Sequence, residues 1–488
     1  MFKRLAAIIL SLALLLSVVG TASANVIDPA LVPEETGEIT VYMYGDKTPR
    51  MQELCANEYA KVFLEEINCV VNIEYISWSE YGSGKMTDRM ILSGEPFDAT
   101  WTDKDWLTQS VNKGYVQPVE ELIEKYMPHY KAVTNPDALT SFVWSDGHMY
   151  AIPFGNKPTA DTFRTICVRQ DLLEEVGMTS VSTIEEVKQF VSLVHEKHPE
   201  MYATMDYVLP AGLLRGFGDR NLTDITTGLW IDEITGEVVS VVDSEEFKQL
   251  CELFAEWYAQ GLISKDLLTN TTSNNVLFES GNYMFWRGTC GTTVYENLPN
   301  LKKVVPTAQT AEYFIGGEKP KFKSSYENTA FQIPVTSENG QYVALFLDLL
   351  CTKEYVNLFT YGIEGVDYTV ENGKVHRINT SELIADWLMF NSNISLFPEA
   401  MPDDFIPTYQ AWDNGALPSK KLGLSINYDD IKTEYAQISA VWSEFAMPMM
   451  AGVVSYEEGI DTLKTKLAEA GWDKYVASIS AQVADHLK

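Results

Sequence analysis

Two short motifs carry residues that could bind a metal ion or a phosphate group, and each departs from the pattern that its chemistry needs. His195-Glu196-Lys197-His198 is one residue short of the H-E-x-x-H zinc motif, in which the two histidines lie one helical turn apart. Gly82-Ser83-Gly84-Lys85 resembles a phosphate loop, but Met86 follows where a magnesium-binding hydroxyl is required. We therefore expect neither a zinc site nor a nucleotide phosphate site here.

Calcium binding and catalysis would need other residues. Asp219, Asn221 and Asp224 offer clustered oxygen atoms, but Asp224 replaces the glycine that a calcium loop requires, which favours a polar surface loop and leaves bound calcium open. The chain has no nucleophile elbow, and its 6 histidines are scattered, which disfavours Ser/His or Cys/His catalysis. Paired catalytic carboxylates stay open because the sequence does not give the separation of 68 acidic side chains in space. We expect no cofactor and no resident metal.

Aromatic residues are abundant, with 11 Trp, 25 Tyr and 21 Phe. Their flat rings can stack on the C–H faces of sugar rings. Trp257 and Trp442 lie on apolar helical stripes and are expected in the core. The tryptophans at strand ends or among polar loop residues are candidate ligand-binding rings: Trp78, Trp101, Trp286 and Trp412.

An α/β framework must position these candidates. Residues 39–44 alternate like a strand, and Thr48 and Pro49 then begin a helix as N-cap and first residue. Further strands are expected at 70–76 and 97–101, with helices between them. Strands that alternate with helices indicate a largely parallel sheet, whose ligands bind beyond the carboxyl ends of the strands. The loops expected to border a cleft are 45–48, 78–82 and 101–105.

From about residue 154 the pattern predicts a second α/β unit. Strands are expected near 165–168 and 282–286, and helices near 183–195 and 245–261. A later strand is expected at 330–335.

Two hairpin turns and a helical tail complete the pattern. Asp146-Gly147 and Asn372-Gly373 are two-residue hairpin signals between apolar segments. From Tyr428 onward, apolar residues recur with helical spacing. We therefore expect a mostly helical C-terminal region.

The N-terminus has the pattern of a secretory signal. Lys3 and Arg4 precede an apolar run that ends in the small residues 22–24, which is the order of a signal peptide and its cleavage site. The run is shorter than the roughly 20 residues that a membrane-spanning helix needs. We expect residues 1–24 to be removed, which leaves a leader at residues 25–37.

Charge and cysteine usage narrow the partners. Without Lys3 and Arg4 the mature chain has 34 basic and 68 acidic residues, a net charge of −34, so no nucleic acid and no anionic lipid is expected as a partner. The 6 cysteines are widely separated in a chain that is long enough to form a core without disulfides. We expect buried free thiols, with a Cys55–Cys69 pair left open.

The order of several motifs resembles a known family. Ser93-Gly94-Glu95-Pro96-Phe97-Asp98, Asp146-Gly147-His148-Met149-Tyr150-Ala151-Ile152-Pro153 and Glu327-Asn328-Thr329-Ala330-Phe331 follow one another. Together they resemble the extracellular solute-binding proteins of ABC importers, in the group that includes maltose-binding protein. Tyr361-Gly362-Ile363-Glu364-Gly365-Val366-Asp367-Tyr368 and Ser419-Lys420-Lys421-Leu422-Gly423 look like the Gram-positive lipoprotein branch with a distinctive C-terminal domain, which serves polysaccharide or aldouronate importers.

This resemblance, which runs from about residue 39 to the C-terminus, implies a two-lobed α/β fold of the periplasmic-binding-protein type with a hinge. Residues 38–160 and 324–376 would form the first lobe. Residues 161–323 would form the second lobe, completed by 377–488. The ligand is expected in the cleft between the lobes. The branch usually carries a lipidated cysteine at the cleavage site, whereas the first cysteine here is Cys55, so no lipid anchor is expected.

We therefore expect an exported, monomeric solute-binding component of an ABC importer, located outside the cell or in a periplasm. It is expected not to be an enzyme, but to bind an oligosaccharide and deliver it to the membrane permease. The alternative is an exported carbohydrate-active enzyme, a glycosidase or lyase. Trp286, which is followed by Arg287 and Gly288, is the foremost ligand-binding candidate. The full set of candidate ligand-binding residues is Tyr44, Trp78, Trp101, Asp103, Phe154, Asn156, Trp286, Arg287, Glu364 and Trp412.

Overall fold

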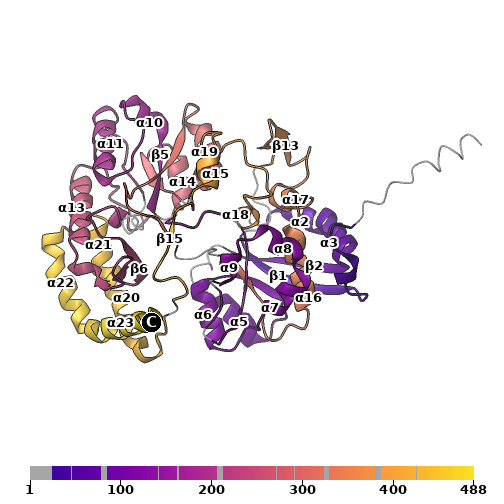
Figure 1. Cartoon of the computed structure of the whole chain (residues 1–488). Helices are drawn as coiled ribbons and strands as arrows, with labels where there is room; N and C mark the ends of the chain where they lie inside the picture. Colours follow the sequence, from indigo (N-terminus) through magenta and orange to yellow (C-terminus); the bar gives the residue numbers. More distant parts are fainter. Residues whose placement is uncertain are drawn as a thin grey trace, which may run out of the picture.

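The protein has two lobes that lie side by side and are connected by several passages of chain (Figure 1). The computed structural model describes residues 25–45, 47–77, 85–140, 142–144, 146–155, 157–161, 164–205, 213–270, 272–288, 290, 292–323, 329–379, 386–424 and 426–488. The expected signal peptide, residues 1–24, lies outside these ranges. We call the body around the five-stranded sheet the first lobe and the body around the sheet β10-β5-β9 the second lobe.

The first lobe is built on a sheet with the strand order β2-β1-β3-β12-β4. β1 (Gly37–Tyr44) pairs in parallel with β2 (Cys69–Ile76) and with β3 (Ala99–Asp103). The parallel arrangement predicted for these strands is therefore confirmed. β12 (Thr329–Gln332) returns from far along the chain and pairs antiparallel with β3 and with β4 (Ile152–Pro153).

Helices cover this sheet for reasons that are local in the sequence. The Thr48 side chain accepts a hydrogen bond from Met51 N at 3.2 Å, and Pro49 is the first residue of α2, as predicted. α16 crosses the core, and most of its residues are buried because it is apolar almost all round. The helices of this lobe are α2 (Pro49–Leu54), α3 (Ala60–Ile67), α5 (Lys85–Ser93), α6 (Lys104–Asn112), α7 (Glu120–Tyr126), α8 (Pro128–Val133), α9 (Pro136–Thr140), α16 (Gly340–Leu350) and α17 (Val356–Tyr361).

The second lobe holds two small antiparallel sheets. In one of them, β5 (Thr165–Arg169) lies between β9 (Phe285–Arg287) and β10 (Thr310–Phe314). β9 begins three residues later than the pattern at 282–286 predicted. The sheet β6-β7-β8 was not predicted, because its short strands, separated by tight turns, lack a long alternating run. Its strands and the helices of this lobe are β6 (Leu222–Thr226), β7 (Leu229–Asp232), β8 (Val238–Ser240), α10 (Gln170–Glu175), α11 (Ile184–Lys197), α13 (Glu245–Ala259), α14 (Asn274–Glu279) and α15 (Thr292–Val304).

The C-terminal helices complete the core of the second lobe, and Figure 1 shows them in yellow beside α13 and β6. Residues from 166 to 315 and from 431 to 483 form one continuous hydrophobic cluster. Tyr475 Oη bonds to Thr226 Oγ1 at 2.9 Å across 249 residues of sequence. The predicted helical region is thus confirmed as α20 (Lys432–Val441), α21 (Met447–Met450), α22 (Tyr456–Glu469) and α23 (Trp472–His486), with a π-helical turn between the first two.

The chain passes from the first sheet to the second and back. One passage runs from β4 to β5, and another runs from β11 (Phe322–Lys323) to β12. Where they leave the first lobe, these passages are hydrogen bonded to each other: Phe154 N donates to Thr329 O at 2.9 Å, and Thr329 Oγ1 donates to Phe154 O at 2.7 Å. A third passage follows α18 (Asp386–Met389) and ends in β15 (Leu417–Pro418), which pairs with β11.

Local predictions about turns and cysteines also have clear outcomes. Asn372 and Gly373 have φ values of 52° and 78° and join β13 (Tyr368–Glu371) to β14 (Lys374–Arg377), which confirms the hairpin. Trp144 N donates to His148 O around Asp146-Gly147, so that turn is confirmed too. All six cysteines are free thiols, and all are buried except the half-buried Cys55.

Candidate functional site

The strand ends of the first lobe meet at one edge of its sheet. β1, β2 and β3 are parallel and end at Tyr44, Ile76 and Asp103. Thr329 pairs with Asp103, so the passages to the second lobe leave from this same edge. The carboxyl ends of the strands therefore face the junction of the lobes, which is where ligands of open α/β sheets bind.

Three aromatic rings cluster at this edge, and we call Tyr44, Trp101 and Trp106 the edge triad. The ring centroid of Tyr44 lies 5.1 Å from that of Trp101 and 5.7 Å from that of Trp106, and the two tryptophan rings are 5.8 Å apart at 87°. Tyr44 and Trp101 are 1% and 2% exposed, whereas Trp106 is only half-buried. The structure thus brings two predicted site residues, Tyr44 and Trp101, into contact, and both pack against the less buried Trp106.

Trp106 was not predicted as a site residue, because it lies just beyond the loop at 101–105 that was expected to border the cleft. It lies in the first turn of α6, directly after β3. The signal that could have identified it is this position, since the first helical turn after a parallel strand lies at the ligand-binding edge. Among the other predicted residues near this edge, Asp103 ends β3 but its side chain is not described, and Trp78 and Asn156 lie outside the described residues.

Phe154 is buried where the first passage leaves the sheet. It is 2% exposed, lies parallel to Tyr130 with the centroids 6.3 Å apart, and meets Phe331 edge-on. Its ring therefore packs in the first-lobe core at the hinge, and its backbone carries the contact with Thr329.

In the second lobe, Trp286 and Arg287 are neighbours on β9. Trp286 is 6% exposed and packs against Phe278 of α14, with ring centroids 6.1 Å apart. Met205 and Tyr283 belong to the same small cluster. Arg287 is half-buried, and it points to the other side of the sheet because side chains alternate along a strand. In this conformation Trp286 is therefore a packing residue.

Glu364 is exposed and lies beside the β13-β14 hairpin. Figure 1 shows this hairpin at the upper right, above α17 and α2. Asp367 anchors the hairpin by accepting hydrogen bonds from Arg50 Nε at 2.8 Å and from Arg50 Nη2 at 2.7 Å.

Trp412 and Asp413 tie the passages together, and we call Trp412, Asp413, Lys321, Thr159 and Ala160 the hinge knot. Trp412 is 4% exposed, and its indole N–H donates to Ala160 O at 2.8 Å. Lys321 Nζ lies 3.9 Å from the Trp412 ring centroid and donates to Trp412 O at 2.6 Å. Burial lowers the pKa of Lys321 below its usual range, and Asp413 opposes that shift.

The carboxylate of Asp413 is the acceptor of the hinge knot. Thr159 N donates to it at 3.1 Å and Ala160 N at 2.9 Å, and Lys323 Nζ lies 3.6 Å away. Residues of all three passages therefore meet here. Trp412, which was predicted to lie in a polar loop, is held in this knot.

A buried ionic network continues from the knot into the second lobe. Asp161 N donates to Phe322 O, and the Asp161 carboxylate lies 3.4 Å from both Arg164 and Arg215. Burial lowers the pKa of Arg164 to about 10, so it stays charged at neutral pH. Asp224 forms ion pairs with Arg215 and Lys421. Asp224, the central carboxylate of the possible calcium site, is therefore already paired with two cationic side chains.

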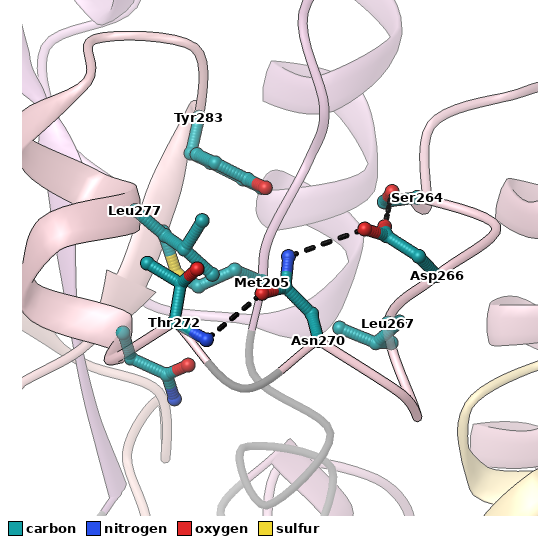
Figure 2. A pocket seen from close by; sticks show the side chains of 9 residues that line it. Met205, Ser264, Asp266, Leu267, Asn270, Thr272, Leu277 and Tyr283 are labelled. Carbon is teal, nitrogen blue, oxygen red and sulfur yellow. Dashed lines mark hydrogen bonds between the residues drawn. The ribbon is translucent and has the colours of Figure 1, made fainter.

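A small pocket of about 280 Å³, open solvent included, lies elsewhere in the second lobe (Figure 2). Its apolar side is formed by Met205, Leu277 and Tyr283, and its polar rim includes Asp266 and Asn270. The rim groups already bind one another, since Asn270 Nδ2 donates to Asp266 Oδ2 at 3.3 Å and Ser264 also donates to Asp266.

Its size and position argue against this pocket as the main ligand site. The volume falls below the roughly 300–1,000 Å³ of typical ligand pockets. Tyr283 precedes β9, whose other end leads to Cys290, which packs with Trp412 near the hinge. The pocket therefore lies at the end of the sheet away from the hinge knot.

Neither a membrane-spanning helix nor a cluster of metal ligands occurs in the described ranges. None of the helices there combines the length and the apolar composition that a bilayer crossing needs. Within the same ranges, no three His, Cys, Asp or Glu side chains are grouped so that they could hold a metal ion.

Family comparison decides the class of this two-lobed architecture. Residues 58–362 match the family described as "Bacterial extracellular solute-binding protein". The chain belongs to this family. Residues 420–488 also match a domain of unknown function, and in this solute-binding protein they form the C-terminal helices of the second lobe.

Relatives cover almost the whole chain. A "Carbohydrate ABC transporter substrate-binding protein" from Streptococcus pneumoniae serotype 4 is 24% identical, with 92% of this chain and 91% of the relative covered. The N-glycan transport protein NgtS from Streptococcus pneumoniae, solved with Man5GlcNAc, has a TM-score of 0.71 at 23% identity, with 92% and 98% of the two chains covered. FusA from S. pneumoniae, solved with kestose, has a TM-score of 0.60 at 16% identity, with 92% and 99% covered. The family supports the binding-protein interpretation and not the exported enzyme.

Proposed function

We propose that this solute-binding protein captures an oligosaccharide between its lobes and delivers it to the permease of an ABC importer. The observation that carries the proposal is the edge triad, which places a half-buried aromatic ring at the strand edge from which the lobes are connected. The names of the relatives support the ligand class, since they describe carbohydrate and oligosaccharide transport.

The proposed site combines both lobes. The first lobe contributes the edge triad, whose rings come from β1, from β3 and from the first turn of α6. The second lobe contributes Arg287, a half-buried guanidinium that can donate several hydrogen bonds to sugar hydroxyls. Trp286 and Phe154 act as supports, because their rings are buried in the two cores. Glu364 stays a candidate contact, because its neighbour Asp367 binds Arg50 in the first turn of α2, after the end of β1.

The lobes are assigned as the resemblance implies. Residues 38–160 and 324–376 form the first lobe, and residues 161–323 with most of 377–488 form the second. The membership of β12 in the first sheet and of the C-terminal helices in the second core supports this division. The start of the last segment departs from it, because Leu388 and Met389 of α18 pack in the first-lobe core.

We also propose export with removal of residues 1–24, a location outside the cell, at its surface or in a periplasm without a lipid anchor, and action as a monomer. The extracellular family supports export. The sequence around residues 21–25 holds no cysteine that could be lipidated at a cleavage site.

Thermal-shift and calorimetric titrations of the mature protein test the function. The panel is Man5GlcNAc, kestose and an alginate oligomer, each mixed with the protein and then recovered for product analysis. We expect one neutral oligosaccharide to bind with a stoichiometry near one and to be recovered intact. A ligand at 100 times its Kd should stabilise the fold by about 2.7 kcal/mol. Cleavage of a sugar, or the absence of binding across a broad oligosaccharide panel, would contradict the proposal.

A further inference from the structure

The three rings of the edge triad differ in what they can offer to a ligand. Tyr44 and Trp101 are 1% and 2% exposed, so their faces are covered. Trp106 is half-buried, and both buried rings contact it. The triad therefore has two inner members and one member with a solvent-accessible surface.

Backbone geometry fixes the position of Trp106. β3 ends at Asp103 and α6 begins at Lys104, so Trp106 lies in the first turn of the helix at the strand edge. The next residue, Leu107, is fully buried in the first-lobe core and anchors that turn. Figure 1 shows α6 on the side of the first lobe that is turned toward the second lobe.

We infer that Trp106 is the ring on which a sugar stacks, and that Tyr44 and Trp101 are positioning residues that hold it. This inference rests on the proposed function and assigns its principal first-lobe contact. The face of an aromatic ring carries partial negative charge, which attracts the polarised C–H groups on one face of a pyranose or furanose ring. A ring that its neighbours already hold loses little conformational entropy when it binds.

Trp286 and Trp412, the candidate tryptophans that the structure describes in the second lobe and the hinge knot, lack such a surface. Trp286 is packed against Phe278, and Trp412 has Lys321 over its ring. Both are less than a tenth exposed. Tryptophan therefore packs within the protein at positions 286 and 412, whereas at position 106 it can contact a ligand.

Calorimetry with Man5GlcNAc and kestose on the mature protein and three variants tests this inference. We expect Trp106→Ala to bind the sugar that the unmodified protein binds about 30-fold more weakly. Its melting temperature without sugar should change by less than about 3 °C, because the ring is half-buried in a large protein. Trp106→Phe should regain much of the lost affinity. Trp472→Phe, which alters a half-buried tryptophan in the C-terminal helices, is the control and should bind normally.

The outcomes separate this inference from the proposed function. If the unmodified protein binds sugar and Trp106→Ala binds it equally well, the inference is wrong and the proposed function stands. A large fall in the melting temperature, or a Phe variant as weak as the Ala variant, would also overturn the stacking role. Absence of binding by the unmodified protein across the broad oligosaccharide panel would instead overturn the proposed function itself.

Discussion

The edge triad and the hinge knot both centre on tryptophan, but different forces hold their rings. In the edge triad, ring packs on ring, and the outermost member is half-buried. In the hinge knot, Trp412 donates from its indole N–H and has a lysine ammonium over its face. The comparison teaches that burial and polar partners, more than residue type, distinguish a ring that can meet a ligand from one that fixes the chain.

The two lobes also differ in how they are built. The first lobe places its strand edge beside the junction, with Trp106 in the helical turn that directly follows β3. The second lobe is completed by the C-terminal helices, whose buried residues belong to its hydrophobic core. We therefore expect substitutions between these helices and the rest of the second lobe to affect stability. Substitutions at the strand edge of the first lobe should affect binding.

The largest expected effect is at Gly452, where the C-terminal region meets α13. A Cβ atom here would lie 2.1 Å from Phe254 O, and the residue has φ +75°. Gly452→Ala should lower the free energy of unfolding by about 3 kcal/mol or more, which combines backbone strain with overpacking. Urea unfolding measures this loss.

Gly415→Ala is the matched control for Gly452→Ala. Gly415 also has φ +75°, but no heavy atom lies within 4 Å of its added Cβ. It should lose only about 1 kcal/mol of unfolding free energy, from backbone strain alone. Equal losses for the two variants would show that the C-terminal helices do not press on α13 as described.

Asp413→Ala probes the hinge knot. The change removes the acceptor of the Thr159 and Ala160 amides, which should cost about 2 kcal/mol of unfolding free energy because those donors are left without it. Asp485→Ala removes an exposed carboxylate paired with Lys488 and should change stability by less than about 0.5 kcal/mol. Chemical unfolding measures the stability loss of both variants. Equal losses would mean that Asp413 contributes no more to stability than an exposed surface ion pair.

The smallest effect is expected at Asp367, in the hairpin of the first lobe and away from the edge triad. Burial alone would raise the pKa of this carboxyl, but Arg50, Ile363 N and Asn379 bind the ionised form and hold the pKa below its usual range. The carboxylate therefore contributes stability at pH values above its unfolded pKa, near 4, and this contribution is lost as the pH falls through the lower folded pKa.

Asp367→Asn should consequently be about 1 kcal/mol less stable than the unmodified protein at pH 7. The difference should narrow as the pH falls toward 2, and unfolding curves at both pH values measure it. Sugar affinity should stay unchanged. A difference that is independent of pH would mean that the charge of Asp367 is not what anchors the hairpin.

Local signals in the sequence were sufficient for much of the fold. The strands at β1 and β2, the Thr48 cap and the Asn372-Gly373 turn depend on neighbouring residues, and each was predicted within a few positions. β6-β7-β8 was missed because short antiparallel strands are stabilised mainly by their partners and by the core behind them.

The candidate site was harder to predict, because burial is a property of tertiary packing. Trp101 and Trp286 were expected at strand ends, but they lie in the middle of β3 and of β9, and rings from other elements cover both of them. Trp106 looked like an ordinary helical residue, and only the pairing of β3 with β1 and β12 places its helical turn at the junction. The strand edge at which the candidate residues gather was therefore expected from the sequence, whereas Trp106, the half-buried member of the triad, was not.

The contact between Thr226 and Tyr475 has a consequence for biosynthesis. Since these residues are 249 positions apart, the second lobe lacks part of its core until almost the entire polypeptide has left the ribosome. A nascent chain that is missing its last helices exposes apolar surface on α13, and this delays stable folding. Such a delay suits a member of an extracellular family, because a secretion channel transports polypeptides that have not yet folded.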